Sequence, residues 1–193
     1  MLNHTGTEEL SAPGLLLRRF TLEDAPAMFA NWASDERVTR YLSWSAHASV
    51  EETKEILAQW IPEYEKSNYY HWLIVLEGIP VGSMSLFDVS DWHRHAEVGY
   101  CIGAAYWNRG ITTKALALVM DFAFGTVGFE RLIAKHDVEN PASGRVMQKV
   151  GMAQEGILRR HCRRKSDGIY SDLVCYGILK EEWAARRKTP ALG

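Results

Sequence analysis

The sequence is poor in cysteine, contains no long apolar run and carries no strong excess of charge. Its three cysteines, Cys101, Cys162 and Cys175, are odd in number and lack CxxC spacing. This excludes a disulfide framework and a zinc site, and we expect reduced thiols. No run approaches the roughly 18 apolar residues that a membrane span needs, and the polar start of the chain lacks the features of a secretory signal. These absences predict a cytoplasmic protein without a membrane partner.

Charge is nearly balanced, with 22 Lys and Arg against 24 Asp and Glu and a formal net charge of -2. This balance gives no general electrostatic reason to expect direct binding to nucleic acid. One basic run, residues 159–165, departs from the average. Two interpretations stay open for it: a solvated strand end and loop, or a patch that meets anionic phosphates or an acidic partner.

At 193 residues with 47% hydrophobic residues, the chain has the length and composition of one soluble globular domain. No internal repeat, low-complexity tract or long Gly/Ser linker divides it. We therefore expect a single domain at residues 15–183, with an N-terminal tail at 1–14 and a C-terminal tail at 184–193.

The spacing of apolar residues predicts alternating strands and helices. Helices are expected to begin near residues 21 and 49, to precede Gly125, and to run from Asn140-Pro141 to Gly151. Strands are expected at residues 15–20, 72–76, 81–87, 96–102, 131–135, 152–158 and 171–179. The order β-α-α-β-β-β-α-β-α-β-β predicts an α/β (α+β) fold, with a mixed, largely antiparallel sheet of six to seven strands flanked by helices on both faces.

The strand that ends at Ile102 is followed by a loop and then directly by a helix. Such a junction leaves unpaired backbone N–H groups at the positive end of a helix, which suits a pyrophosphate. Gly110 allows a close backbone approach, and Arg109 adds charge. A glycine before a helix is also common in ordinary turns, so these residues alone leave both interpretations open.

The segment Asn140-Pro141-Ala142-Ser143 offers a second possible contact. If two neighbouring strands diverge, their exposed backbone groups can pair with an extended amide-bearing arm of a cofactor. The following helix would then present Asn140 and Ser143 to that arm. The alternative is local: Asn140 caps the helix, and Ser143 satisfies a nearby backbone amide.

Several motifs occur in order along most of the chain: AEVGYCI at residues 96–102, YWNRGITTKAL at 106–116, NPAS at 140–143, KVGM at 149–152, EGILR at 155–159 and YSDLVCY at 170–176. Together they resemble the RimJ/RimL-type branch of the GNAT N-acetyltransferases, over residues 15–183. The resemblance implies a GNAT-like fold, acetyl-CoA as cosubstrate and no metal. It permits a monomer or a homodimer.

The same resemblance implies which residues meet the cosubstrate. The pantetheine arm would lie along the strand that ends at Ile102, the pyrophosphate would sit on N–H groups from Asn108 to Thr113, and Ser143 would hydrogen-bond or protonate the leaving sulfur. The positions implied for acetyl-CoA are Tyr100, Cys101, Ile102, Trp107, Asn108, Arg109, Gly110, Ile111, Thr112, Thr113, Asn140 and Ser143.

Direct attack on a thioester requires a neutral amine. An α-amine with a pKa of about 7.7 to 8.0 costs roughly 1 kcal/mol to deprotonate at pH 7, whereas a lysine near 10.4 costs about 4.6 kcal/mol. An α-amine therefore needs little help, and the resemblance favours the N-terminal α-amine of a protein as acceptor. A small amine (polyamine, amino acid or aminoglycoside) is one alternative, and a CoA-binding regulatory module without turnover is another.

Glu97 is the first candidate for a general base, because it lies on the strand beside the expected thioester. The other interpretation is a structural carboxylate in an ion pair. His93 and His95 form a His-x-His pair, but no further ligand stands at a recognisable spacing. No metal site is therefore expected.

Overall fold

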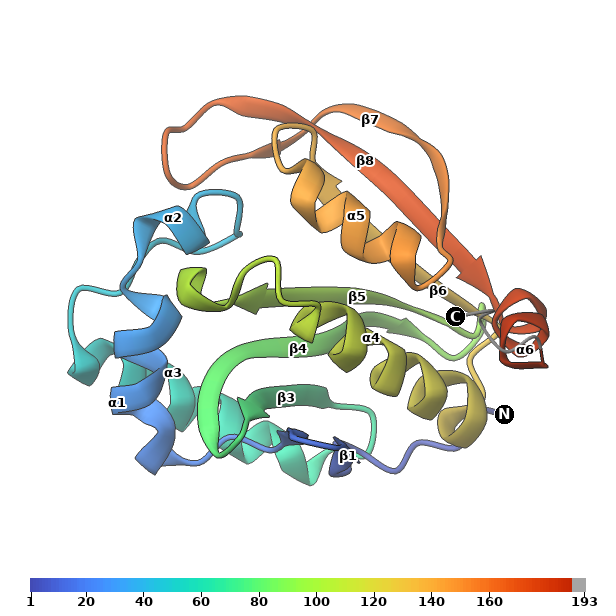
Figure 1. The fold of residues 1–193 in the computed structure, drawn as a ribbon, viewed down its shortest axis with the longest axis horizontal. Helices are drawn as coiled ribbons and strands as arrows, with labels where there is room; N and C mark the ends of the chain where they lie inside the picture. Colours follow the sequence, from blue (N-terminus) through green and yellow to red (C-terminus); the bar gives the residue numbers. More distant parts are fainter. Residues whose placement is uncertain (189–193) are drawn as a thin grey trace.

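An eight-stranded sheet organises the molecule, with the strand order β1-β2-β3-β4-β5-β6-β8-β7 (Figure 1). The structure is a computed structural model that describes residues 1–188. Its strands are β1 (Leu10–Ala12), β2 (Leu15–Arg18), β3 (Tyr70–Leu76), β4 (Ile79–Ser90), β5 (His95–Ile102), β6 (Arg131–Asp137), β7 (Ala153–Arg163) and β8 (Tyr170–Leu179). Neighbouring strands pair antiparallel except β5 and β6, which are parallel.

The expected mixed, largely antiparallel sheet is confirmed, with one strand beyond the six to seven expected. The extra strand is β1, which lies in the segment expected to be an N-terminal tail and pairs with β2. Three residues are too few to show a period of two, so the sequence does not reveal this strand. The chain before β1 is also held, since Thr7 is buried and its hydroxyl donates to the carbonyl of Tyr69 at 2.9 Å.

Helices cover both faces of the sheet (Figure 1). They are α1 (Ala25–Met28), α2 (Glu36–Thr39), α3 (Val50–Trp60), α4 (Ile111–Phe122), α5 (Pro141–Lys149) and α6 (Lys180–Lys188). Helices α4 and α5 bury Leu116 and Met147 in one core, while α1 and α3 bury Met28 and Leu57 in the other. Each such side chain contributes about 1.5 to 3 kcal/mol through burial. No helix among residues 1–188 has the length and apolarity needed to cross a membrane.

The predicted helix starts are present at both early helices. Thr21 precedes a short 3-10 turn that leads into α1. Ser49 caps α3 by accepting the N–H of Glu52 at 3.1 Å, and the carboxylate of Glu52 reaches back to the N–H of Ala48 at 2.6 Å. Two otherwise unpaired donors are thereby satisfied.

The helical segment that begins with α4 ends later than predicted. It continues as a π turn to Val127, and Gly128, with φ of 88°, ends it. The prediction of an end at Gly125 is therefore wrong. Phe124 and Val127 are buried in the core, and their burial outweighs the roughly 1 kcal/mol that a glycine costs inside a helix.

Helix α6 occupies part of the segment expected to be a C-terminal tail. Trp183 anchors it, because its ring lies 5.3 Å from that of Phe124 and its Nε1 donates to Asp121 at 2.8 Å. The helix continues to Lys188. Residues 189–193 of the expected tail lie outside the described residues.

Candidate active site

Strands β5 and β6 pair only over their first residues and then part. Their parallel register runs from His95↔Arg131 to Glu97↔Ile133. Beyond it, β5 continues to Ile102 beside β4, while β6 continues to Asp137 beside β8. The facing edges at residues 98–102 and 134–137 thus have no strand partner. Their backbone groups are available to an extended amide-bearing ligand.

A cavity of about 360 Å³ lies at this split. Its walls come from the end of β5, the loop before α4, helix α5, and α2 with the turn that follows it. Every residue that the resemblance assigned to acetyl-CoA lines the cavity: Tyr100, Cys101, Ile102, Trp107, Asn108, Arg109, Gly110, Ile111, Thr112, Thr113, Asn140 and Ser143. The structure thus brings the two separate motifs to one place.

The N-terminus of α4 opens onto the cavity without a side-chain cap. Asn108 and Gly110 have left-handed backbone, with φ of 60° and 74°, on either side of Arg109. A Cβ on Gly110 would meet no atom within 4 Å, so the space beside this backbone is open. The first N–H groups of a helix have no partner within it. Together with the helix dipole they form an anion site that fits a diphosphate.

Tyr100 and Ser143 meet at the split. The Ser143 hydroxyl donates to the Tyr100 hydroxyl oxygen at 3.0 Å, and the Tyr100 hydroxyl donates to the backbone oxygen of Ser143 at 3.0 Å. Burial raises the pKa of Tyr100 to about 12, so its phenol is protonated at pH 7. The two residues form a small hydroxyl network on the cavity wall.

Close packing of α5 on β6 sets the position of Ser143. A Cβ on Gly144 would lie 2.5 Å from Nε2 of His136, so this approach requires glycine. Pro141 takes up the first turn as expected. Asn140 occupies the N-cap position as expected, but its side chain makes no capping hydrogen bond. Its amide is instead part of the cavity lining.

Cys101 lies between Tyr100 and Ile102 on β5 and packs toward the opposite core. Its sulfur is 3.3 Å from the hydroxyl of Ser83. Burial raises the pKa of the Cys101 thiol, and a protonated thiol is a poor nucleophile. This environment disfavours an acyl-cysteine intermediate and favours direct transfer to the acceptor. As expected, all three cysteines are free.

Glu97 lies at the vertex of the split but is not part of the cavity lining. Its carboxylate forms an ion pair with Lys135 of β6, and its side chain is 13% exposed. This ion pair agrees with the interpretation of Glu97 as a structural carboxylate. The ion pair favours the structural role of Glu97, and its role as a base is left to the mutational test proposed below.

The sequence analysis missed the wall formed by α2. Arg37, Val38, Tyr41 and Leu42 line the cavity there. Their spacing is helical, and Asp35 caps the helix by accepting the N–H of Arg37 at 2.9 Å. The sequence thus contained two signals of a helix, the apolar spacing and the N-cap residue. A helix of four residues is too short to stand out from a loop by periodicity.

A second missed set forms a stripe along α5. Ala142, Arg145, Val146 and Lys149 line the cavity at spacings of three and four residues. Arg145 and Lys149 bring positive charge to a site whose expected ligand carries phosphates. The sequence analysis considered only Asn140 and Ser143 of this helix, although the same spacing would have indicated the others.

The basic run at residues 159–165 does not line the cavity. Most of its side chains are exposed on β7 and the turn that follows, in agreement with the solvated interpretation. Arg164 is the exception, because its side chain is 4% exposed and pairs with Asp137 at 2.6 Å. The solvated interpretation is therefore wrong at this residue, where the buried carboxylate of Asp137 compensates the guanidinium.

The split sheet, the open helix N-terminus and the hydroxyl pair beside them define an acyl-transferring enzyme, with a site for a donor that carries phosphates. Helices on both faces of a mixed sheet complete this arrangement (Figure 1).

Comparison with known proteins agrees with this class. Residues 14–153 match the acetyltransferase (GNAT) domain. The chain is 30% identical over 173 residues to the uncharacterized N-acetyltransferase YoaA of Bacillus subtilis, covering 89% of this chain and 96% of YoaA. It is 27% identical to the putative ribosomal N-acetyltransferase YdaF of Bacillus subtilis, covering 80% and 84%. It is also 27% identical to the spermidine N(1)-acetyltransferase of Escherichia coli, covering 61% and 62%.

One solved structure has the same fold and contains a derivative of CoA. RimJ of Mycobacterium smegmatis, in complex with CoA-disulfide, matches with a TM-score of 0.80 and 26% identity, over 93% of this chain and 89% of that chain. The chain therefore belongs to the GNAT acetyltransferase family. GNAT enzymes take acetyl-CoA as cosubstrate.

Proposed function

We propose that this enzyme transfers the acetyl group of acetyl-CoA to the N-terminal α-amine of a protein, as a member of the RimJ/RimL-type branch. The observation that carries the proposal is the split between β5 and β6, whose cavity is lined by every residue that the motifs assigned to acetyl-CoA. The relationship to the putative ribosomal N-acetyltransferase YdaF supports this acceptor.

The chain divides the binding of acetyl-CoA between two structural devices. The unpaired amides at the start of α4, with Arg109 beside them, hold the diphosphate. The free edge of β5 pairs with the amide-bearing arm, and Asn140 adds its side-chain amide. These contacts deliver the thioester end toward Tyr100 and Ser143.

Acetyl-CoA supplies an activated acyl group, and residues of the protein assist the proton transfers. As the acceptor nitrogen bonds to the carbonyl carbon, the carbon–sulfur bond breaks and the sulfur leaves as a thiolate. Ser143, whose hydroxyl proton is directed to Tyr100 in this structure, turns it toward that sulfur and donates a hydrogen bond or a proton, and solvent restores a proton that is given up. The acetylated nitrogen gives its excess proton to solvent, so the products are an amide and a free thiol.

The charge of the cavity favours an α-amine over a polyamine. Within the described chain, its lining contains the basic residues Arg37, Arg109, Arg145 and Lys149 but no aspartate or glutamate. A polycation would find no counter-charge there, and an amine with a high pKa would find no carboxylate base. An α-amine, partly neutral at pH 7, needs neither. The relationship to a spermidine acetyltransferase keeps the small amine as the second candidate.

Mass spectrometry of acetyl transfer to three acceptors tests the proposal. The acceptors are a peptide with a free α-amine, the same peptide blocked at its N-terminus but bearing a lysine, and spermidine. We expect acetylation of the free peptide, with kcat/KM at least about a hundredfold above the other two, because lysine-like amines cost about 3.6 kcal/mol more to deprotonate.

The other outcomes separate the alternatives. Transfer to spermidine alone would show a small-amine enzyme. CoA binding by calorimetry without transfer to any amine would indicate a regulatory module. Absence of CoA binding would contradict the proposed site itself.

Replacement of Glu97 by glutamine is expected to leave the acidic limb of the pH–rate profile in place. The carboxylate is already engaged by Lys135, so its loss should lower the free energy of unfolding by about 1 kcal/mol rather than alter proton transfer. Lys135→Gln is the matched control for loss of the ion pair. An acidic limb that disappears in Glu97→Gln but persists in Lys135→Gln would identify Glu97 as the base.

A further inference from the structure

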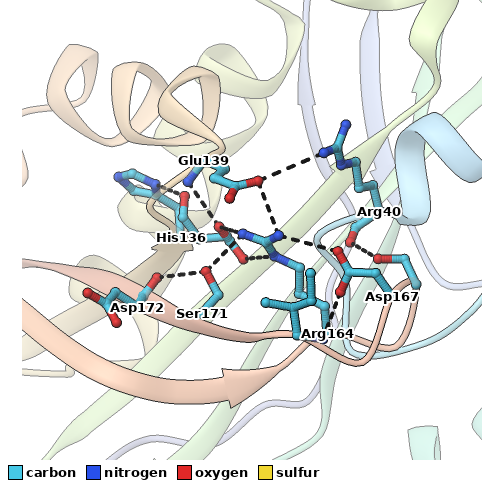
Figure 2. Close-up of polar contacts among 10 residues, drawn as sticks. Arg40, His136, Glu139, Arg164, Asp167, Ser171 and Asp172 are labelled. Carbon is cyan, nitrogen blue, oxygen red and sulfur yellow. Dashed lines mark hydrogen bonds and ion pairs between the residues drawn. The ribbon is translucent and has the colours of Figure 1, made fainter.

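Arg164 is the buried centre of a polar cluster beside the cavity (Figure 2). Its Nε and Nη2 donate to the two carboxylate oxygens of Asp137 at 2.6 and 2.8 Å, and Nη2 also donates to the hydroxyl of Ser171 at 2.9 Å. Its Nη1 lies 3.1 Å from a carboxylate oxygen of Glu139 and 3.4 Å from one of Asp167. We call these five residues the Arg164 cluster.

Two members of the Arg164 cluster hold the turn that leads into α5. Asp137 ends β6, its carboxylate accepts the N–H of Glu139 at 2.9 Å, and its carbonyl accepts the N–H of Asn140 at 2.7 Å. Asn140 and Ser143 follow directly and line the cavity. Arg164 thus fixes the segment from which the α5 wall begins.

The same guanidinium lies against the α2 wall. Its central carbon is 5.5 Å from the ring centre of Tyr41, which lines the cavity. The hydroxyl of Ser166 donates to the carbonyl of Arg40 at 2.9 Å, and the Arg40 guanidinium lies 3.8 Å from the Glu139 carboxylate. The turn between β7 and β8 therefore connects α2 to the start of α5 (Figures 1 and 2).

We propose that Arg164 is a positioning residue for acetyl transfer, which sets the distance between the α2 wall and the α5 wall that carries Ser143. This inference rests on the proposed acetyl transfer and adds a residue that does not touch the reacting atoms. It reaches both walls from a hairpin that is itself outside the cavity lining.

Stability alone does not account for this cluster. A buried ion pair is often no more stabilising than apolar residues of the same volume, although removal of one partner is costly. Arginine has five N–H donors in a fixed plane, and here its three nitrogens all face acceptors that belong to β6, the turn before α5 and the β7–β8 hairpin. A lysine, with a point charge and three donors, would keep the charge but not this geometry.

The first test is Arg164→Lys, measured at a temperature where circular dichroism shows it fully folded. We expect kcat/KM for the acceptor to fall about tenfold, because small displacements of reacting groups have large kinetic effects. The dissociation constant of CoA should stay within about twofold, since the α4 amides hold the diphosphate independently. Arg159→Lys, which changes an exposed arginine on β7, is the matched control.

A second variant keeps the test decisive should Arg164→Lys fail to fold. Glu139→Gln changes a half-exposed side chain that links Arg164 to Arg40. We expect a melting temperature near that of the wild type and a fall of about threefold in kcat/KM for the acceptor, smaller because only one link is weakened.

Two results would overturn the inference. One is wild-type acceptor kinetics in every folded variant; the other is loss of CoA affinity in parallel with activity, which would indicate general loosening of the fold. A wild-type enzyme that acetylates no amine would instead contradict the proposed function, so the two failures are distinguishable.

Discussion

Ser143→Ala is expected to lower kcat about a hundredfold while the dissociation constant of CoA changes by less than about twofold. The Ser143 hydroxyl lies at the split and is held 3.0 Å from that of Tyr100, where it can donate to the departing sulfur. Positioned acids contribute about 10² to 10⁴ in rate. The α4 amides provide the main contacts to the diphosphate, so binding should remain. Single-turnover kinetics with calorimetry on the same preparation measures both quantities.

Tyr100→Phe provides the companion measurement. The phenol orients Ser143 and, with its pKa raised to about 12 by burial, remains protonated throughout the assay range. If the two hydroxyls act as one unit, the double variant should be little slower than Ser143→Ala alone. Ser90→Ala, at the far end of β4, is the control for loss of a serine hydroxyl. Unchanged kcat in Ser143→Ala would remove Ser143 from the mechanism.

Gly110→Ala is expected to weaken CoA binding at least about tenfold, or about 1.4 kcal/mol. Gly110 has φ of 74° and precedes the open amides of α4. A side chain there costs about 1 to 2 kcal/mol in the left-handed region, and its Cβ would project into open space at the cavity wall. Both effects move or cover the amides that hold the diphosphate. Gly110→Val, which is bulkier and β-branched, should weaken binding further.

Gly78→Ala separates the backbone penalty of the substitution from its effect on CoA binding. Gly78 lies in the turn between β3 and β4, with φ of 83° and open space around a built Cβ. Its substitution imposes a similar backbone penalty away from the cavity. Calorimetric titration with CoA, together with thermal melts, should show comparable losses of stability in the two alanine variants but weaker binding only in Gly110→Ala. Equal CoA affinity in both would contradict the assignment of the diphosphate to the α4 N-terminus.

The sequence predicted the structure best where the local conformation depends on residues that are close together in the chain. The loop at residues 103–110 and the start of α4 lie where the motif indicated, because a glycine and unpaired helix amides have the same chemistry in any fold of this kind. The order of elements along the chain also followed from apolar spacing, apart from the three residues of β1 and the helices α2 and α6. Short or amphipathically weak elements give too little periodicity to detect.

Charged residues showed the limit of that approach. Glu97 was the expected base, yet its partner Lys135 stands on a different strand. Arg164 was counted within a basic surface run, yet Asp137 and Glu139 reach it from β6 and the turn after it. The role of a charged side chain depends on which groups lie near it in space. The spacing of residues along the sequence does not give that information.

The sequence by itself determined the strand, the glycine-containing loop and the helix start to which we assign the phosphate-bearing donor, since each of these properties is local to the backbone. Only the tertiary structure decided what surrounds them. It brought α2 and α5 to one cavity and placed the β7–β8 hairpin against both, outside the cavity lining (Figure 1). Those contacts join residues more than a hundred positions apart, and they arise from the packing of helices on a split sheet rather than from any pattern along the chain.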